Sequence, residues 1–232
     1  KIRELVLEGT VKAMLIEIPS IPGLLLLKNP STNTTNLHAV LLHGENYVRF
    51  IEYVANIMSK LRPECSNTYL GKAGEILRAI QNLSTDKPLA NMKAVIETPA
   101  LQYLATWLGA DVVGVLKVEH EIPVQLRDIA RVEEELKRYG GSAVVIAVQN
   151  SGAFSMLAEL ASKYGAKLVA VPDPGTYRNS TYIYLEEAHR LAHQAAGYTV
   201  TSSEGQNLTT VLAIVLASLA VIALAIFLWL RR

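Results

Sequence analysis

Histidine and carboxylate side chains are the groups in this sequence with the clearest potential for chemistry, because together they are common ligands of transition metals. His38 and His43 stand five positions apart in the stretch NTTNLHAVLLHGENY. His189 and His193 stand four apart in a segment with helical spacing, so one helix face carries both imidazoles. The second pair can hold zinc, but its charged neighbours favour a solvated helix face. The spacing of the first pair decides nothing, so its role depends on the elements that position it.

The sequence lacks the motifs of several other chemistries. It contains no GxGxxG or GxxxxGK[ST] loop for nucleotide phosphates, no GxSxG nucleophile elbow and no HExxH motif. The net charge is +1 and no basic stripe is interleaved with aromatic residues, which argues against nucleic acid as a partner. With Cys65 as the one cysteine, no internal disulfide can form. We therefore expect a binding protein and not an enzyme.

The C-terminal end carries the signature of a membrane anchor. Residues 208–230 are uncharged and are apolar apart from Thr209, Thr210 and Ser218, and two arginines follow them. About 20 apolar residues in a helix span a bilayer, and basic residues favour the cytoplasmic side. We expect a single-pass helix over 208–230 that spans the cell membrane, preceded by a polar tether over 198–207. The C-terminus is then cytoplasmic and the main domain extracellular. Four glycosylation sequons fit a cell-surface glycoprotein; they begin at Asn33, Asn82, Asn179 and Asn207.

Short apolar runs interrupted by proline and glycine fill the N-terminal region. The runs over 11–18 and 23–29, separated by PSIPG, predict two β-strands. They do not make up a complete lobe, so residues 1–62 are interpreted as a partial N-terminal α/β lobe.

Two helices are predicted after this region. Apolar residues recur at spacings of three and four over 46–61 and again over 64–83. Pro63 separates the two helices, because proline disfavours helical backbone in the residue before it. Residues 84–91 are predicted to be a loop that leads into a second domain.

The region 92–197 alternates strands with helices in a regular order. Its strands are apolar on both faces, which is typical of a parallel sheet covered by helices on both sides. The sequence therefore predicts an α/β domain of four βα units. Strands are expected at 93–98, 111–118, 142–148 and 166–171, and helices at 99–109, 123–140, 152–165 and 181–197.

Polar residues follow each predicted strand. In an open parallel sheet, ligands bind outside the carboxyl ends of the strands. We therefore expect a site among these strand ends, which include carboxylate, imidazole and amide groups: Glu97-Thr98-Pro99, Val118-Glu119-His120, Gln149-Asn150-Ser151 and Pro172-Asp173-Pro174.

The order of several segments between Leu37 and Ala192 is familiar. They are NLHAVLL, RPECSNTYLGKAGEILRAIQNL, VIETPALQYLATWLGAD, EHEIPVQLRDIARVEEELKRYGGSAVVIAVQN, LAELASKYGAKLVAVPDPG and TYIYLEEAHRLA. This order resembles the zinc- and manganese-binding solute receptors of ABC importers. The resemblance implies two α/β lobes joined by a long spine helix, with the metal between the lobes. It assigns the spine helix and its linker to 63–91 and the C-terminal lobe to 92–197.

The resemblance also implies a set of metal ligands, three histidines and one carboxylate. His38 matches the second histidine and Asp173 matches the carboxylate, whereas Thr98 stands where the third histidine would be. The first histidine belongs to a part of the N-terminal lobe that the chain lacks. Glu97, Gln149 and Asn150 are further candidates to line the site, the last two as neutral residues near the position of a common glutamate.

Three functions remain open. The first is a membrane-anchored receptor that binds zinc or manganese outside the cell and presents it to the permease of an ABC importer. The second is a receptor-like surface module that has lost its metal and serves as a binding or structural protein; Thr98, Asn36 beside His38, and the neutral Gln149 and Asn150 favour it. The third is an enzyme on the same scaffold, which no motif of the sequence supports.

Overall fold

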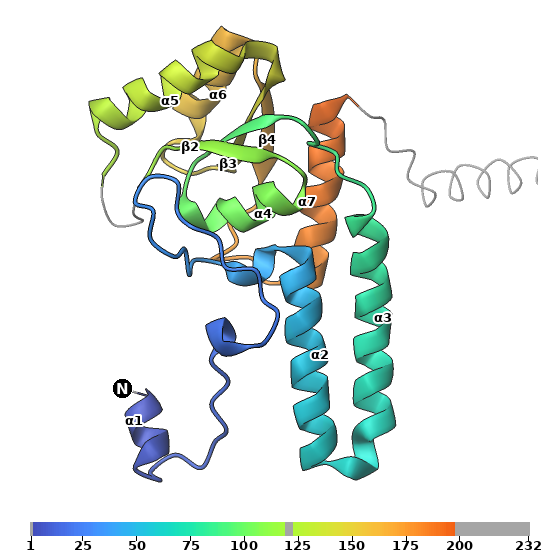
Figure 1. Ribbon diagram of the computed structural model, residues 1–232. Helices are drawn as coiled ribbons and strands as arrows, with labels where there is room; N and C mark the ends of the chain where they lie inside the picture. Colours follow the sequence, from blue (N-terminus) through green and yellow to red (C-terminus); the bar gives the residue numbers. More distant parts are fainter. Residues whose placement is uncertain (1, 119–122, 198–232) are drawn as a thin grey trace, which may run out of the picture. The chain divides into compact units, whose positions relative to one another are not determined.

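The computed structural model describes residues 2–118 and 123–197 and contains a parallel β-sheet with helices packed around it (Figure 1). Within these residues the sheet has four strands in the order β2-β1-β3-β4, with every pair parallel. The prediction of a parallel α/β sheet is therefore confirmed. Its strands are β1 (Lys93–Ile96), β2 (Asp111–Val115), β3 (Ala143–Val148) and β4 (Lys167–Val171).

Helices cover both faces of the sheet, as the apolar strands require. Ile96 and Ile146 pack on one face with Leu104 of α4 (Gln102–Trp107) and Leu185 of α7 (Thr181–Ala196). The alternate residue Val145 packs on the other face, in one cluster with residues of α5 (Leu126–Tyr139) and α6 (Phe154–Tyr164). Because successive strand residues point to opposite faces, one short strand serves two cores.

Two long helices form a hairpin that extends away from the sheet (Figure 1). α2 (Gly44–Leu61) and α3 (Ser66–Ser84) are joined by the short 3-10 helix η3 (Pro63–Cys65). The break falls next to Pro63, as predicted. The end of α3 nearest the sheet enters the core, where Ile80 is 0% exposed, whereas Leu70 on the same helix is 45% exposed. α3 packs against α7 there.

The predicted strands over 11–18 and 23–29 are wrong. Residues 11–29, all described by the structure, contain no β-strand, and Lys28 makes only an isolated bridge with Thr35. Side chains form hydrogen bonds with backbone groups that would otherwise pair with a neighbouring strand. The amide of Asn46 bonds to both the N–H and the C=O of Leu25, and the Tyr103 hydroxyl accepts from the Leu27 N–H. The segment is held in place by these side chains.

The remaining helices are short. α1 (Ile2–Leu7) begins the described chain, and 3-10 turns lie at η1 (Ile18–Ser20), η2 (Val40–Leu42), η4 (Pro99–Leu101) and η5 (Gly140–Ser142). The strands predicted to end at residues 98 and 118 end at 96 and 115, so their last predicted residues are loops.

The expected tether over 198–207, the expected membrane helix over 208–230 and the sequon at Asn207 lie outside the described residues. None of the helices in the described ranges combines the length and the apolar composition needed to cross a bilayer.

Candidate functional site

A cavity of about 900 Å³ lies at the carboxyl edge of the sheet. β1 and β3 are adjacent in the sheet, and the chain leaves them toward opposite sides, to β2 and to β4. Such a switch point is where open α/β sheets bind ligands. The cavity is lined by the loop after Lys28 and by all four strand ends: Asn29, Thr32, Thr34, Thr35, Asn36, His38, Ala39, Glu97, Thr98, Pro99, Ala100, Lys117, Val118, Val148, Ser151, Asp173, Pro174 and Gly175.

His38 reaches the cavity on a loop that is tied to the start of α4. The buried Asn36 donates from Nδ2 to the Pro99 carbonyl and to Gln102 Oε1, both at 2.8 Å, and its Oδ1 accepts from the His38 N–H at 2.9 Å. Tyr103 donates to the Asn36 carbonyl at 2.6 Å. His38 itself is exposed. Its imidazole is thus accessible to a ligand, while the backbone beneath it is fixed.

Asp173 lies in a tight turn that follows β4. Its Oδ1 accepts from the Gly175 N–H at 2.8 Å and its Oδ2 accepts from the Thr176 hydroxyl at 3.2 Å. The buried Tyr184 donates to the Pro172 carbonyl at 3.1 Å. Burial, and to a lesser degree the charge of Asp173, raises the pKa of Tyr184, so this phenol remains a neutral donor. The carboxylate is exposed and keeps lone pairs for a ligand in the cavity.

Glu97 is the buried carboxylate of the cavity, with 1% of its surface exposed. Its Oε2 accepts from the Val148 N–H and from the Ser151 hydroxyl, both at 2.9 Å. Its Oε1 faces the Lys117 ammonium at 3.4 Å. A buried carboxylate requires such partners, because an uncompensated charge in the interior is costly. The Lys117 ammonium group is therefore a fixed positive charge in the wall of the cavity.

Thr98 lines the cavity next to Glu97 and is buried. It is the N-terminal capping residue of η4, so its position is set by the turn into α4. A threonine hydroxyl is a weak ligand for zinc at neutral pH, because the metal favours imidazole, thiolate and carboxylate. Thr98 can contact a ligand here without replacing the histidine of the resembling receptors.

Gln149 and Asn150, the other two candidates, are both described and are not among the residues that line the cavity. Gln149 turns its amide back onto β4, where Nε2 donates to the Ala170 carbonyl at 2.9 Å. Asn150 has φ +60°, the left-handed conformation that asparagine tolerates in tight turns. This turn carries the chain around so that Ser151 faces the cavity instead.

Three residues important to the cavity were missed by the sequence interpretation. Lys117 was predicted to lie within a strand, yet β2 ends at Val115 and frees it to face Glu97. Asn36 was treated as a neighbour of His38, and nothing in its spacing indicates the bonds that it makes to α4. Ser151 belongs to a strand-end triplet that was recognised, but its bond to Glu97 joins residues far apart in sequence.

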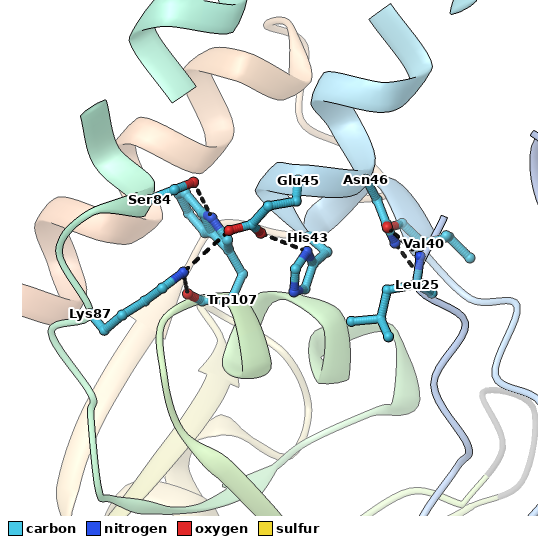
Figure 2. A network of polar contacts seen from close by, with 8 residues as sticks. All are labelled: Leu25, Val40, His43, Glu45, Asn46, Ser84, Lys87 and Trp107. Atoms are coloured by element: carbon cyan, nitrogen blue, oxygen red, sulfur yellow. Dashed lines mark hydrogen bonds and ion pairs between the residues drawn. The ribbon is translucent and has the colours of Figure 1, made fainter. Parts of the chain in front are cut away.

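His43 has a different role from His38. It caps the N-terminus of α2, and its Nδ1 contacts Glu45 Oε2 at 2.9 Å (Figure 2). Glu45 in turn faces Lys87 Nζ at 3.6 Å, and Lys87 donates to the Trp107 carbonyl at 2.8 Å. His43 does not line the cavity. His38 therefore lines the cavity, whereas His43 has a structural role at the start of α2.

Three solved structures of bacterial proteins share this fold. FpvC of Pseudomonas aeruginosa, in complex with Mn²⁺, is 19% identical, with a TM-score of 0.59 over 77% of this chain and 68% of that one. AdcAII of Streptococcus pneumoniae is 20% identical, with a TM-score of 0.60 over 81% and 72%. A mutant of the laminin-binding adhesin Lmb of Streptococcus agalactiae is 18% identical, with a TM-score of 0.60 over 82% and 73%. No curated protein sequence gives a significant match.

The family assignment rests on a sequence profile that matches most of the chain. The profile of zinc-uptake complex component A, periplasmic, matches residues 11–192. This range includes His38, Asp173 and every strand of the sheet. Members of this family are binding proteins of metal import and not enzymes. The chain thus belongs to the family of zinc-uptake complex component A, the zinc- and manganese-binding solute receptors of ABC importers.

Proposed function

We propose that this protein binds a divalent transition metal ion, Zn²⁺ or Mn²⁺, in the cavity at the carboxyl edge of the sheet and presents it to the permease of an ABC importer. The observation that carries the proposal is the meeting of His38 and Asp173 at one cavity. These residues come from opposite ends of the folded chain, and an imidazole with a carboxylate is a donor set that suits both metals.

In this proposal His38 and Asp173 are the protein ligands and water completes the coordination. Thr98 supplies at most a weak contact, and Glu97 is engaged by Lys117. A site with two strong protein ligands holds its ion less tightly than a site with four, because each missing ligand is replaced by exchangeable water. Among the similar structures, FpvC holds Mn²⁺ and a variant of AdcAII holds Zn²⁺.

The test is a calorimetric titration of the tag-free protein with Zn²⁺ and with Mn²⁺. His38→Ala and Asp173→Asn should each weaken binding at the cavity by more than about tenfold, because each removes a first ligand and even outer partners of a ligand contribute about 10–100-fold. Glu159→Gln is the matched control: it removes an exposed carboxylate of α6 that does not line the cavity, and it should bind as the parent does. Equal affinity in the parent, His38→Ala and Asp173→Asn would overturn the proposal.

A specific observation favours a second function, a receptor-like protein that no longer binds metal in this cavity. Lys117 places a positive charge against the buried carboxylate nearest to Thr98. A cation in the cavity wall repels a second cation, and it satisfies Glu97 without a metal. Absence of any Zn²⁺ or Mn²⁺ binding at the cavity, with the fold intact, would support this function.

The proposed receptor is anchored in the cell membrane by residues 208–230 and tethered by 198–207, with the main domain outside. We propose the domain organisation that the sequence suggests: a partial N-terminal lobe over 1–62, the spine helix and linker over 63–91 and the C-terminal lobe over 92–197. Fractionation of cells that express the full chain checks the anchor. The protein should sediment with membranes at high salt and be released only by detergent, and recovery in the soluble fraction would contradict the anchor.

Glycosylation is part of the same proposal. The asparagines of the three described sequons, Asn33, Asn82 and Asn179, are all exposed, so a glycan on any of them would project into solvent. The mass of the intact protein from its native membrane, before and after enzymatic deglycosylation, tests it. An unchanged mass would remove the glycoprotein assignment without affecting the metal site.

A further inference from the structure

A second group of metal-binding side chains lies away from the cavity, where α7 meets the loop after α3. It consists of Asp86, His189 and His193. The two histidines are four residues apart on α7, and the fold brings Asp86 to them from the loop that leads into β1. Each residue offers one ligand atom, and these three atoms lie within 4.8 Å of one another.

The three residues of this group also contact one another directly. His193 Nε2 lies 2.7 Å from Asp86 Oδ2. His189 Nε2 lies 3.2 Å from the Asp86 carbonyl, an acceptor that favours the proton on this nitrogen. The two imidazole rings stand edge to face, with their centroids 4.7 Å apart. The backbone bond of His189 is the kind of partner that orients a metal-ligating histidine.

Burial divides the group into a fixed part and a movable part. His189 is buried and its ring lies beside the Trp107 indole, with a centroid distance of 5.8 Å. The Asp86 side chain is 58% exposed. Ligand atoms around a tetrahedral zinc stand roughly 3.4 Å apart, from bond lengths of about 2.0–2.2 Å. A small rotation of the exposed Asp86 side chain would open the 2.7 Å contact to this spacing and admit an ion from solvent.

This group lies at the opposite edge of the sheet from the cavity. Asp86 precedes β1, so it belongs to the edge where strands begin. Lys167, the first residue of β4, donates to the Ala196 carbonyl at 2.8 Å, which places the end of α7 at that same edge. An ion bound here would therefore not be cargo held in the cavity. It would join the loop after α3 to the last helix of the lobe.

We infer that Asp86, His189 and His193 form a second divalent metal site, with a preference for Zn²⁺. Two imidazoles and a carboxylate are a known zinc ligand set, and water takes the fourth position. The ion would clamp α7 to the end of α3. The inference is independent of the proposed cavity site.

The test uses the tag-free full chain with His38→Ala and Asp173→Asn, so that the cavity no longer competes for metal. Titration of this parent with ZnCl2 should show one bound Zn²⁺ per chain, and Zn²⁺ should raise its melting temperature. Adding His193→Gln should weaken binding by more than about tenfold and abolish the thermal shift, because glutamine retains a hydrogen bond to Asp86 but is a poor zinc ligand. Co²⁺ should give the visible absorption of a four-coordinate site in the parent and not in the His193→Gln variant.

Glu186→Gln in the same parent is the matched control, because it removes an exposed carboxylate of α7 outside the group. It should bind one Zn²⁺ as the parent does. The inference is overturned if the parent binds no Zn²⁺, or if His193→Gln, folded by circular dichroism, binds it as tightly as the parent. Either result leaves the cavity site of the unmodified chain to be judged by its own variants.

Discussion

Lys117 and Glu97 decide how a cation is received at the cavity. Glu97 is a carboxylate beside the expected metal position, yet it accepts two hydrogen bonds and faces an ammonium group. In this arrangement it is a poor ligand for a second cation. With Lys117 present the cavity offers two strong metal ligands, His38 and Asp173. Without Lys117, Glu97 would be available as a third.

We predict that Lys117→Met makes Zn²⁺ bind to the cavity more tightly, by about tenfold or more. The substitution removes one positive charge near the ion, and in a partly buried site this favours cation binding by more than about 1 kcal/mol. The free energy of unfolding without metal should fall by about 3 kcal/mol, since Glu97 is left as an unpaired buried charge, and Zn²⁺ should restore part of it. Calorimetric titration and urea unfolding measure the two effects.

Lys163→Met is the control for this prediction. Lys163 also pairs with a glutamate, but its side chain is 60% exposed, so its removal should cost less than about 1 kcal/mol and leave metal binding unchanged. Unchanged or weaker Zn²⁺ binding in Lys117→Met would mean that Glu97 cannot reach the ion.

At the scale of elements, α3 is a helix with one end in the core and one end in the hairpin. Ile80, near the sheet, is fully buried, whereas Leu70 lies in the protruding part of the hairpin and is 45% exposed. The same helix thus contributes very unequally to stability along its length.

We predict that Ile80→Ala lowers the free energy of unfolding by about 2–5 kcal/mol, because it opens a cavity in the core, and that Leu70→Ala lowers it by about 1 kcal/mol or less. Chemical unfolding followed by circular dichroism compares the two variants directly. Similar losses at both positions would show that the protruding part of α3 is covered by something that buries Leu70.

At the scale of the whole molecule, a polar network joins segments that are distant in sequence (Figure 2). His43 and Glu45 belong to the start of α2, Lys87 to the loop after α3 and Trp107 to the end of α4. The Trp107 indole also donates to the Ser84 hydroxyl at 2.9 Å. The hairpin is fixed to the sheet domain by these contacts as well as by the apolar core.

This network predicts a pH dependence of stability. The contact with His43, followed by smaller effects that include the charge of Lys87, lowers the pKa of Glu45 from 4.5 to about 2. A carboxyl whose pKa is lower in the folded state stabilises the fold above its ordinary pKa, and the contribution disappears as the pH falls from about 4.5 to about 2. Because 52% of the side chain is exposed, solvent screening limits the contribution to about 0.5–1 kcal/mol.

The measurement compares Glu45→Gln with the unmodified protein in urea unfolding between pH 7 and pH 3. The difference in unfolding free energy should be present at pH 7 and shrink steadily below pH 4.5. Glu52→Gln, on the same helix and paired with Arg49 at the surface, is the control and should show a smaller difference at every pH. A difference between Glu45→Gln and the parent that does not change with pH would assign its effect to packing.

The parallel sheet, its helices on both faces and the break at Pro63 can be predicted from the sequence, because they depend on the local order of apolar residues, proline and glycine. The sequence also led to His38 and Asp173 through resemblance to a family of metal receptors. It failed over 11–29, where apolar runs predict strands but the amide of Asn46 and the hydroxyl of Tyr103 occupy the backbone groups that strands would pair.

Which distant residues come into contact could be learned only from the three-dimensional structure. It separated His38 from His43, turned the Gln149 amide onto β4, placed Lys117 against Glu97 and brought Asp86 to His189 and His193. Each of these outcomes depends on contacts between residues far apart in the chain or on the conformation of a single turn residue. Local periodicity carries neither kind of information, since it reports which face of an element is apolar and not what that face will meet.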